Sequence, residues 1–279
     1  MRSIVKAHFM ETLGKVPLLG GILRSQAQRF DEGSVIEIRS GIGAGLKWRR
    51  HHRNANAYWL GSYELGTQLA LQRLLRAGDV FYDVGANAGF FTVLAARLVG
   101  PSGRVFAFEP VPENVESVRE QVELNRLSWC EVVPLAVGAH SGQRTLSYVP
   151  GSSAMAHLGP RRLGGELQIQ VQAVTLDEFI VHYPFPSLVK LDVEGAEGEV
   201  LQGAMETIGR GARFILELHS SELAIEVARL LLRAGYVLKL LDGSAAQRPA
   251  EATHLIAQRP NGNPAGRNLE PSLTRTRRF

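Results

Sequence analysis

The sequence predicts an α/β fold in which buried parallel strands alternate with helices. Three stretches, residues 79–98, 104–126 and 188–208, each begin with an apolar, β-prone run and continue with apolar residues at helical spacing. A repeated strand, turn and helix is typical of a parallel sheet with helices on both faces. With 279 residues, 45% of them hydrophobic, the chain is long enough for one such domain with an attachment.

The first predicted strand ends in a glycine turn. The apolar run of residues 80–84 reaches Gly85, and Gly89 follows before the helical pattern begins. Such a turn places backbone N–H groups and the positive end of a helix at the carboxyl edge of the sheet, which indicates a ligand site. Asp83 and Asn87 supply polar side chains beside it. An ordinary turn with purely structural glycines is the alternative interpretation.

An acidic residue closes the second predicted strand. Residues 104–108 form the apolar run, and Glu109 follows before Pro110. An acid at this place can accept both ribose hydroxyls of a nucleoside. A nicotinamide-binding turn usually carries G-x-G-x-x-G, whereas this one has only Gly85 and Gly89. The pattern therefore indicates a nucleoside cofactor and favours S-adenosylmethionine (SAM).

The segments ahead of the first strand predict a small N-terminal cap. Residues 1–30 are expected to be helical. Residues 35–39 and 46–50 are expected to form a hairpin around a glycine-rich turn. Leucines at helical spacing predict a helix over residues 65–76, which leads into the main domain.

After Glu109 the alternation continues with a helix over residues 113–126 and a third strand over residues 131–137. Two strands with alternating patterns, 144–149 and 167–174, flank the loop 150–166, which is rich in glycine and proline. Long loops over the carboxyl edge of an α/β sheet commonly shape substrate pockets. The loop residues that could contact an acceptor are Ser152, Ser153, Met155, His157, Arg161 and Arg162. A disordered surface loop is the alternative.

A second strand and turn deliver acids to the same edge. Residues 188–191 lead to Asp192 and Glu194, and Gly195 makes the turn. The helix after this turn is expected to bury one side, made of Val200, Leu201, Ala204, Met205 and Ile208.

The next predicted strand repeats this arrangement. Residues 214–218 bring Glu217 and His219 to the strand end, and Ser220 is placed to cap the following helix. The last two predicted strands, 236–241 and 254–257, are close enough along the chain to pair.

The formal charge of +4 is unevenly distributed. Residues 1–60 hold ten Lys or Arg against four acids, whereas residues 61–259 hold seventeen against twenty-two. The basic clusters at residues 48–53 and 275–278 could attract anionic substrates, phosphate or a membrane surface, and a solvated face is the preferred interpretation. No nucleic-acid partner is expected, and no feature predicts an oligomeric state.

Cys130 is the only cysteine, so an internal disulfide and a cysteine-built metal site are excluded. A reducing cytoplasm is the expected compartment. The apolar run 16–23 is too short to span a bilayer and lies behind Glu11, in a position that does not fit a secretory signal. Weak membrane contact through an amphipathic N-terminal helix is the alternative.

Two motifs, D-V-G-A-N-A-G at residues 83–89 and K-L-D-V-E-G-A-E at residues 190–197, carry a family resemblance. The chain resembles the FkbM family of SAM-dependent methyltransferases from about residue 61 to residue 257. Four shorter motifs, G-S-Y-E, F-A-F-E-P, V-T-L-D-E-F and E-L-H, occur in the order and spacing of that family. The resemblance implies a Rossmann-like, seven-stranded, mostly parallel sheet with an antiparallel last strand. It divides the chain into a helix and hairpin cap (1–60), a SAM-binding domain (61–259) and a disordered basic tail (260–279).

The resemblance also implies roles for single residues. The cofactor-binding set is Glu64, Asp83, Gly85, Ala86, Asn87, Gly89, Glu109, Pro110 and Ala136. Within it, Glu109 would bind the ribose and Glu64 would reach the amino group of SAM. Many class I methyltransferases bind adenine through an acid after the third strand, but residues 135–138 contain none. A backbone carbonyl or Ser141 is therefore expected to take that role.

The resemblance implies O-methylation of a sugar, glycan or secondary metabolite, which requires a base for the acceptor hydroxyl. The candidates are Asp192, Glu194, Glu217 and His219. His219 has the most suitable intrinsic pKa, and Asp192 would orient it or the acceptor. A purely structural histidine is one alternative. A divalent ion held by Asp192, Glu217 and His219 is another, although the prediction includes no metal.

Two other function classes use the same fold. A nicotinamide-dependent oxidoreductase can be built on this type of sheet, because fold does not settle function. A binding domain that retains the cofactor fold without catalysis is the third interpretation.

Overall fold

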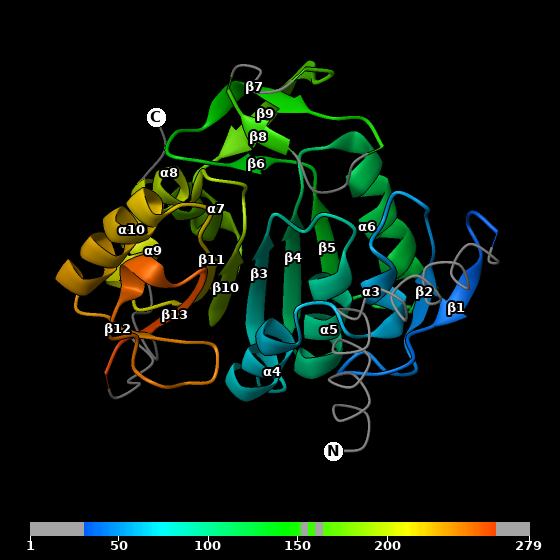
Figure 1. Cartoon of the computed structure of the whole chain (residues 1–279), viewed down its shortest axis with the longest axis horizontal. Coiled ribbons are helices and arrows are strands. Elements are labelled where there is room, and N and C mark those ends of the chain that lie inside the picture. Colours follow the sequence, from blue (N-terminus) through cyan, green and yellow to red (C-terminus); the bar gives the residue numbers. More distant parts are fainter. Residues whose placement is uncertain (1–30, 152–155, 160–163, 261–279) are drawn as a thin grey trace, which may run out of the picture.

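The computed structural model describes residues 31–151, 156–159 and 164–260. Its centre is a seven-stranded sheet with the order β12-β13-β11-β10-β3-β4-β5. Helices flank this sheet, and a second, four-stranded sheet lies above it (Figure 1). Neighbouring strands from β5 to β11 run parallel, whereas β13 is antiparallel to both β11 and β12. The predicted mostly parallel sheet with an antiparallel last strand is confirmed.

The elements follow one another in the predicted order. The central strands are β3 (Val80–Val84), β4 (Arg104–Phe108), β5 (Cys130–Val133), β10 (Leu188–Leu191), β11 (Arg213–Glu217), β12 (Val237–Lys239) and β13 (His254–Gln258). The helices are α3 (Asn56–Leu60), α4 (Leu65–Leu74), α5 (Phe90–Val99), α6 (Pro112–Leu124), α7 (Leu176–His182), α8 (Glu197–Gln202), α9 (Met205–Gly209), α10 (Ser221–Arg233) and the 3-10 turn η1 (Pro249–Glu251). Ser220 caps α10 as predicted, because its side chain accepts a hydrogen bond from Leu223 N.

Alternating side chains of the central strands build two apolar cores. Tyr82 of β3 lies in the core covered by α7, α8, α9 and α10, whereas its neighbour Phe81 lies in the core covered by α3, α4 and α5. Successive residues of a strand point to opposite faces, so a strand that is apolar throughout must be covered on both sides. This double cover leaves only the ends of the strands open for a ligand.

The predicted hairpin is present as β1 (Val35–Glu37) and β2 (Lys47–Arg49), which pair antiparallel. Trp48 of β2 is fully buried and makes an edge contact with Phe90 at a centroid distance of 6.0 Å. On the other side, Arg49 N donates a hydrogen bond of 2.9 Å to Gln121 of α6. The hairpin therefore packs into the same core as the helices after the glycine turn.

The predicted third strand, residues 131–137, is divided between two sheets. Residues up to Val133 form β5 of the central sheet, whereas β6 (Ala136–Val137) pairs with β9 (Leu167–Val174). Pro134 stands at the break, where its missing N–H cannot continue a ladder. The strands β6, β7 (Gly142–Tyr148), β8 (Ala156–Leu158) and β9 form the sheet that lies above the carboxyl ends in Figure 1, here called the small sheet.

Two other details differ from the sequence prediction. The loop 150–166 contains the strand β8, which pairs with β7. The predicted continuous helix after Gly195 is broken at Gly203, where a Cβ would lie 2.2 Å from Gly138 O. The chain turns there into the separate helix α9, so Met205 is 54% exposed instead of buried.

Several predictions fall outside the described residues. They are the helix over residues 1–30, the tail after residue 260, and the loop side chains Ser152, Ser153, Met155, Arg161 and Arg162. Within the described residues, no helix combines the length and the apolar character needed to cross a bilayer.

The turn after β3 yields a stability prediction. Gly85 has φ +81°, and a Cβ on it would lie 1.8 Å from Asp192 O. Gly85→Ala should lower the free energy of unfolding by about 3 kcal/mol or more, because left-handed strain of about 1–2 kcal/mol is added to a backbone clash. Gly235→Ala is the control, since Gly235 also has φ +81° and no atom within 4 Å of the added Cβ. Equal urea midpoints for the two variants would show that the clash is relieved without cost.

Candidate functional site

The carboxyl ends of β3, β4 and β10 face the small sheet across a cavity that both line. From the strand ends, the turns after them and the first turn of α6, the lining includes Gly85, Asn87, Glu109, Pro110, Asn114, Asp192 and Glu194. The apolar part of the lining includes Leu135, Ala136, Val137, Leu146, Ala156 and Leu158. Polar groups gather at the strand ends, and Leu135 and side chains of the small sheet form an apolar slot opposite them.

Glu109 is fixed at the end of β4 by two backbone groups. Its carboxylate accepts hydrogen bonds from Asn87 N at 2.7 Å and from Val111 N at 2.9 Å. The residue is only 4% exposed. Burial raises the pKa of Glu109 to about 7, although the two backbone hydrogen bonds oppose the shift. The glycine turn thus orients the acid that the sequence placed beside it.

Asp83 lies behind the turn and is not among the residues that line the cavity. Its side chain is fully buried and accepts a hydrogen bond of 2.6 Å from Thr92 Oγ1 of α5. Burial raises the pKa of Asp83, and the charge of Lys190 opposes that rise. Gly89 starts α5 with φ +87°, where a Cβ would lie 3.2 Å from Val118 Cα. Asp83 and Gly89 thus support the turn on the side away from the cavity.

Lys190 is a buried cation between the acids of two strands. It is 3% exposed, and its Nζ lies 2.9 Å from Asp192 Oδ2. It pairs in register with Asp83 on β3, and its Nζ stands 5.1 Å from the ring centre of Phe91. Burial lowers the pKa of Lys190, but the carboxylates of Asp192, Asp83 and Glu64 raise it by more. The lysine is therefore charged and compensates the acids around it.

A cluster of three acids surrounds His219, here called the His219 cluster. Its Nδ1 lies 3.0 Å from Glu197 Oε1. Its Nε2 lies 3.4 Å from Glu194 Oε2 and 3.8 Å from Asp192 Oδ1. The hydrogen bond to Glu197 is the main cause that raises the pKa of His219 to about 9, against the effect of burial. His219 is therefore an imidazolium at neutral pH.

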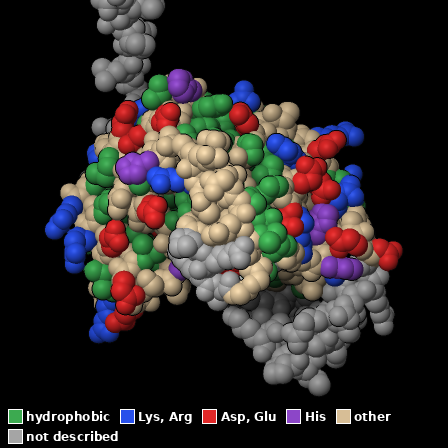
Figure 2. Space-filling model, turned by 90° about the horizontal axis from the view of Figure 1, so that it is seen from above, with side chains coloured by type: hydrophobic (Ala, Val, Ile, Leu, Met, Phe, Trp, Pro, Cys, Tyr) green, Lys and Arg blue, Asp and Glu red, His purple; other side chains and the backbone are tan. Residues whose placement is uncertain are grey.

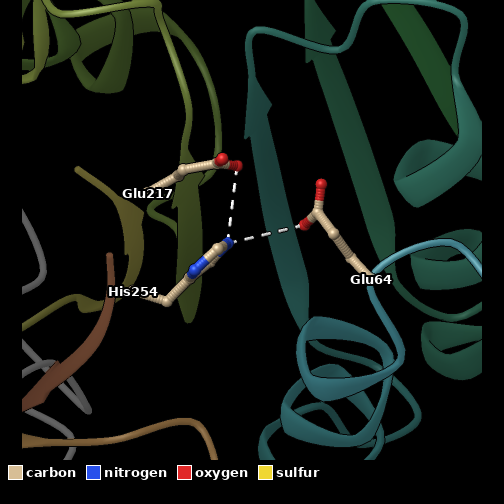
Figure 3. Close-up of side chains that lie close together, drawn as sticks. All are labelled: Glu64, Glu217 and His254. Carbon is tan, nitrogen blue, oxygen red and sulfur yellow. Dashed lines mark ion pairs between the residues drawn. The ribbon is translucent and has the colours of Figure 1, made fainter. Parts of the chain in front are cut away.

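A second cluster joins three segments that are distant in sequence, here called the His254 cluster. His254 begins β13, Glu217 ends β11, and Glu64 precedes α4 with φ 39°. Figure 3 shows His254 between the two carboxylates, with Nε2 3.5 Å from Glu217 Oε2 and 3.7 Å from Glu64 Oε2. Burial lowers the pKa of His254, but the two acids raise it to about 9.

The structure places five of the nine predicted cofactor residues on the cavity. They are Gly85, Asn87, Glu109, Pro110 and Ala136. Asp83, Ala86 and Gly89 lie behind the turn, and Glu64 lies in the His254 cluster. Ser141, the predicted adenine partner, is not in the lining, and its hydroxyl donates a hydrogen bond to Glu178.

Of the four predicted catalytic residues, Asp192 and Glu194 line the cavity. The structure groups the acids and histidines differently from the candidate metal site of Asp192, Glu217 and His219. Asp192 lies with Glu197 and His219, and Glu217 lies with Glu64 and His254, with the donor atoms of each set within 4.8 Å of one another. Divalent cations accept these donor types. Because both histidines are already paired with carboxylates, we describe the two sets as ion-pair clusters.

Three residues of the site were missed by the sequence analysis: Lys190, Glu197 and His254. Lys190 precedes Asp192 by two positions in an otherwise apolar strand. A charged residue in a buried strand is usually paired, so the sequence could have indicated a role for Lys190. Glu197 is fully buried at the start of α8 and accepts hydrogen bonds from Val193 N and Gly195 N. His254 gave no local signal, because its role depends on its neighbours across strands.

The molecule seen from above carries interspersed charges. Figure 2 shows acidic, basic and hydrophobic side chains mixed over this face. Among the described residues on the visible face, basic side chains form no continuous stripe of the kind that follows a phosphate backbone.

The chain is similar to methyltransferases in sequence. The pattern of the methyltransferase FkbM domain matches residues 83–238. Hexuronic acid methyltransferase AglP of Haloferax volcanii is 30% identical over 158 residues, which cover 56% of this chain and 62% of that protein. The chain thus spans less than two thirds of that relative. The 31-O-demethyl-FK506 methyltransferase FkbM of Streptomyces tacrolimicus is 30% identical over 197 residues, covering 59% of this chain and 75% of that protein.

Solved methyltransferase structures also match the chain. One is methyltransferase FkbM from Methylobacillus flagellatus, with a TM-score of 0.45 and 16% sequence identity. That comparison covers 74% of this chain and 56% of the other chain.

Removal of the buried cation should destabilise the protein. Lys190→Met leaves the carboxylate of Asp192 without its partner, and breaking a buried pair in this way costs about 3 kcal/mol of unfolding free energy. The loss should be larger at pH 8 than at pH 5, because an unpaired Asp192 can take up a proton at the lower pH. Urea unfolding at both pH values measures it. Lys47→Met, at an exposed position of β2, is the control. An equal loss for both variants at pH 8 would contradict the assignment.

Proposed function

Because this chain belongs to the FkbM methyltransferase family, we propose that it transfers a methyl group from SAM to a hydroxyl group of a sugar, glycan or secondary metabolite. One observation carries this proposal. The glycine turn, Glu109 and the acids Asp192 and Glu194 all open onto a single cavity. A nucleoside-binding half and an acid-base half thus share one space, as a transfer between two bound molecules requires.

The nucleoside half of the cavity fits an adenosyl group. Glu109 uses one lone pair of each oxygen for a backbone N–H, and a carboxylate has further acceptor sites for ribose hydroxyls. Asn114 Oδ1 is buried in the same wall and has no hydrogen-bond partner among the described residues. The apolar slot beyond it, between Val137 and Leu158, suits a flat base. These residues would hold the nucleoside part of SAM.

The charges near the cavity also suit this cofactor. SAM carries two positive groups and one carboxylate, and when bound it supplies an electrophilic methyl group. Glu64 and Asp192 provide negative charge, while Lys190 balances part of it from within the core. This balance lets a cationic ligand bind without leaving buried acids unpaired.

The chain would promote transfer by alignment, exclusion of water and removal of the acceptor proton. The small sheet lies over the carboxyl ends of the strands and forms one wall of the cavity, which would limit the access of water to the reacting groups. The acceptor hydroxyl would lie beside Asp192 and Glu194, next to His219. The His219 cluster is therefore the proposed acid-base centre.

The names of the relatives support an oxygen acceptor. One relative is named for a hexuronic acid and another for 31-O-demethyl-FK506. The second name points to a hydroxyl oxygen, and a sugar or metabolite hydroxyl is the acceptor class that we propose.

Calorimetry with SAM and with NAD tests the cofactor. SAM should bind, and Glu109→Gln should weaken SAM binding by about 10–100-fold, because hydrogen bonds to a charged acceptor contribute about 1.5–3 kcal/mol. Glu131→Gln, on the exposed side of β5, is the matched control and should bind as the wild type does. Tight binding of NAD without binding of SAM would favour the oxidoreductase interpretation.

Transfer is tested with methyl-labelled SAM and a cell extract. The wild type should label a small molecule or glycan, identified by mass spectrometry, and the label should be stable to mild base, as expected of an ether and not of an ester. Bound SAM with no labelled product would instead support a non-catalytic binding domain.

A further inference from the structure

Glu194, and not His219, presents its carboxylate to the cavity. Glu194 lines the cavity together with Asp192, and its side chain is 39% exposed. His219 is not among the lining residues. Its Nε2 lies 3.4 Å behind the Glu194 carboxylate. An acceptor hydroxyl in the cavity therefore meets Glu194 before it can reach the imidazole.

His219 has no free lone pair to act as a base. Glu197 is fully buried, and its Oε1 already accepts hydrogen bonds from Val193 N at 3.1 Å and Gly195 N at 3.2 Å. This fixed carboxylate holds His219 Nδ1 at 3.0 Å. The other ring nitrogen faces Asp192 and Glu194. Because carboxylates stand on both sides, both ring nitrogens carry protons, and such a ring can only donate.

The backbone holds Glu194 in position. The residue has φ 53°, a left-handed conformation that costs a residue with a Cβ about 1–2 kcal/mol. The hydrogen bonds of Glu197 to Val193 N and Gly195 N secure the turn on both sides of it. One buried acid thus fixes both the histidine and the turn that carries Glu194.

We propose that Glu194 is the catalytic base of the methyl transfer and that His219 is a positioning residue, a fixed cation beside it. This inference rests on the proposed function. The acceptor oxygen forms a bond to the methyl carbon while the carbon–sulfur bond breaks and its electron pair passes to sulfur. The hydroxyl proton moves to the Glu194 carboxylate. From there it passes to water, because the side chain is partly exposed.

The titration behaviour of the two groups agrees with these roles. Burial raises the pKa of Glu194 to about 7, with His219 opposing the rise and Asp192, Glu217 and Glu197 adding to it. The pKa of His219 is about 9. Between these two values the glutamate is ionised while the histidine keeps its charge, so a base and its neighbouring cation exist together.

The rate of transfer should follow the ionisation of Glu194. With the labelled-SAM assay and the acceptor recovered from extract, kcat should rise through pH 7, as Glu194 ionises, and then stay level to pH 9. Glu194→Gln should bind SAM within about threefold of the wild type but transfer at least about 100-fold more slowly, without the rise near pH 7. Glu199→Gln, an exposed acid on α8, is the control and should keep the full rate.

The variant His219→Gln shows whether Glu194 or His219 is the base. Without the neighbouring cation, Glu194 needs a higher pH to ionise. The variant should therefore be about tenfold slower at pH 7 and recover at pH 9. Loss of all transfer by His219→Gln at every pH, with normal transfer by Glu194→Gln, would make His219 the base and overturn the inference. A wild type that transfers no label would refute the methyltransferase proposal itself, and this inference with it.

A measurement without any acceptor tests the charge of His219. Nitrogen NMR of the labelled full chain, assigned by comparison with His219→Gln, should show both ring nitrogens protonated at pH 7.5. A ring with one proton at pH 7.5 would contradict the proposal, whatever the transfer assay shows.

Discussion

The site depends on the close approach of two strand ends, those of β3 and β10. Asp192 N donates a hydrogen bond of 3.1 Å to Val84 O, and the space beside Gly85 is filled by Asp192 O. Since no side chain fits between them, the two backbones form one continuous rim. The glycine turn on one strand and the acidic loop on the other therefore face the same cavity. Helices that cover both faces of a parallel sheet leave the strand ends accessible, and ligands bind at the carboxyl ends.

The close approach of β3 and β10 brings several carboxylates to one edge of the sheet, and their negative charge must be balanced by cations. Lys190 lies between Asp83 and Asp192, His219 among Asp192, Glu194 and Glu197, and His254 between Glu64 and Glu217. Each cation is held by carboxylates from more than one element, so the charges also join the strands and loops of the site. A site of this kind suits a cationic cofactor better than an anionic one.

The fold divides its tasks between the two faces of the sheet. On one face, the aromatic side chains of the hairpin, α3 and α5 pack together, including Trp48, Tyr58 and Phe90. This packing supports the helix that follows the glycine turn. On the other face, α8 and α10 position the loops after β10 and β11, which carry Glu194 and His219. The two halves of the cavity to which we assign the cofactor and the acid-base chemistry are thus supported by separate cores.

The sequence by itself determined the elements and several residues that line the cavity, including Gly85, Asn87 and Glu109. Apolar periodicity is local, so it revealed the strands, the glycine turn and Glu109, and ordered motifs revealed the family. Pro134 was visible too, but a sequence cannot show that the chain changes sheets there. Only the tertiary structure decided which side chains meet. His254, Glu217 and Glu64 come from three distant segments, and the burial of Lys190 and Glu197 depends on neighbouring strands. Contacts of this kind are made by packing between elements, and local patterns do not encode them.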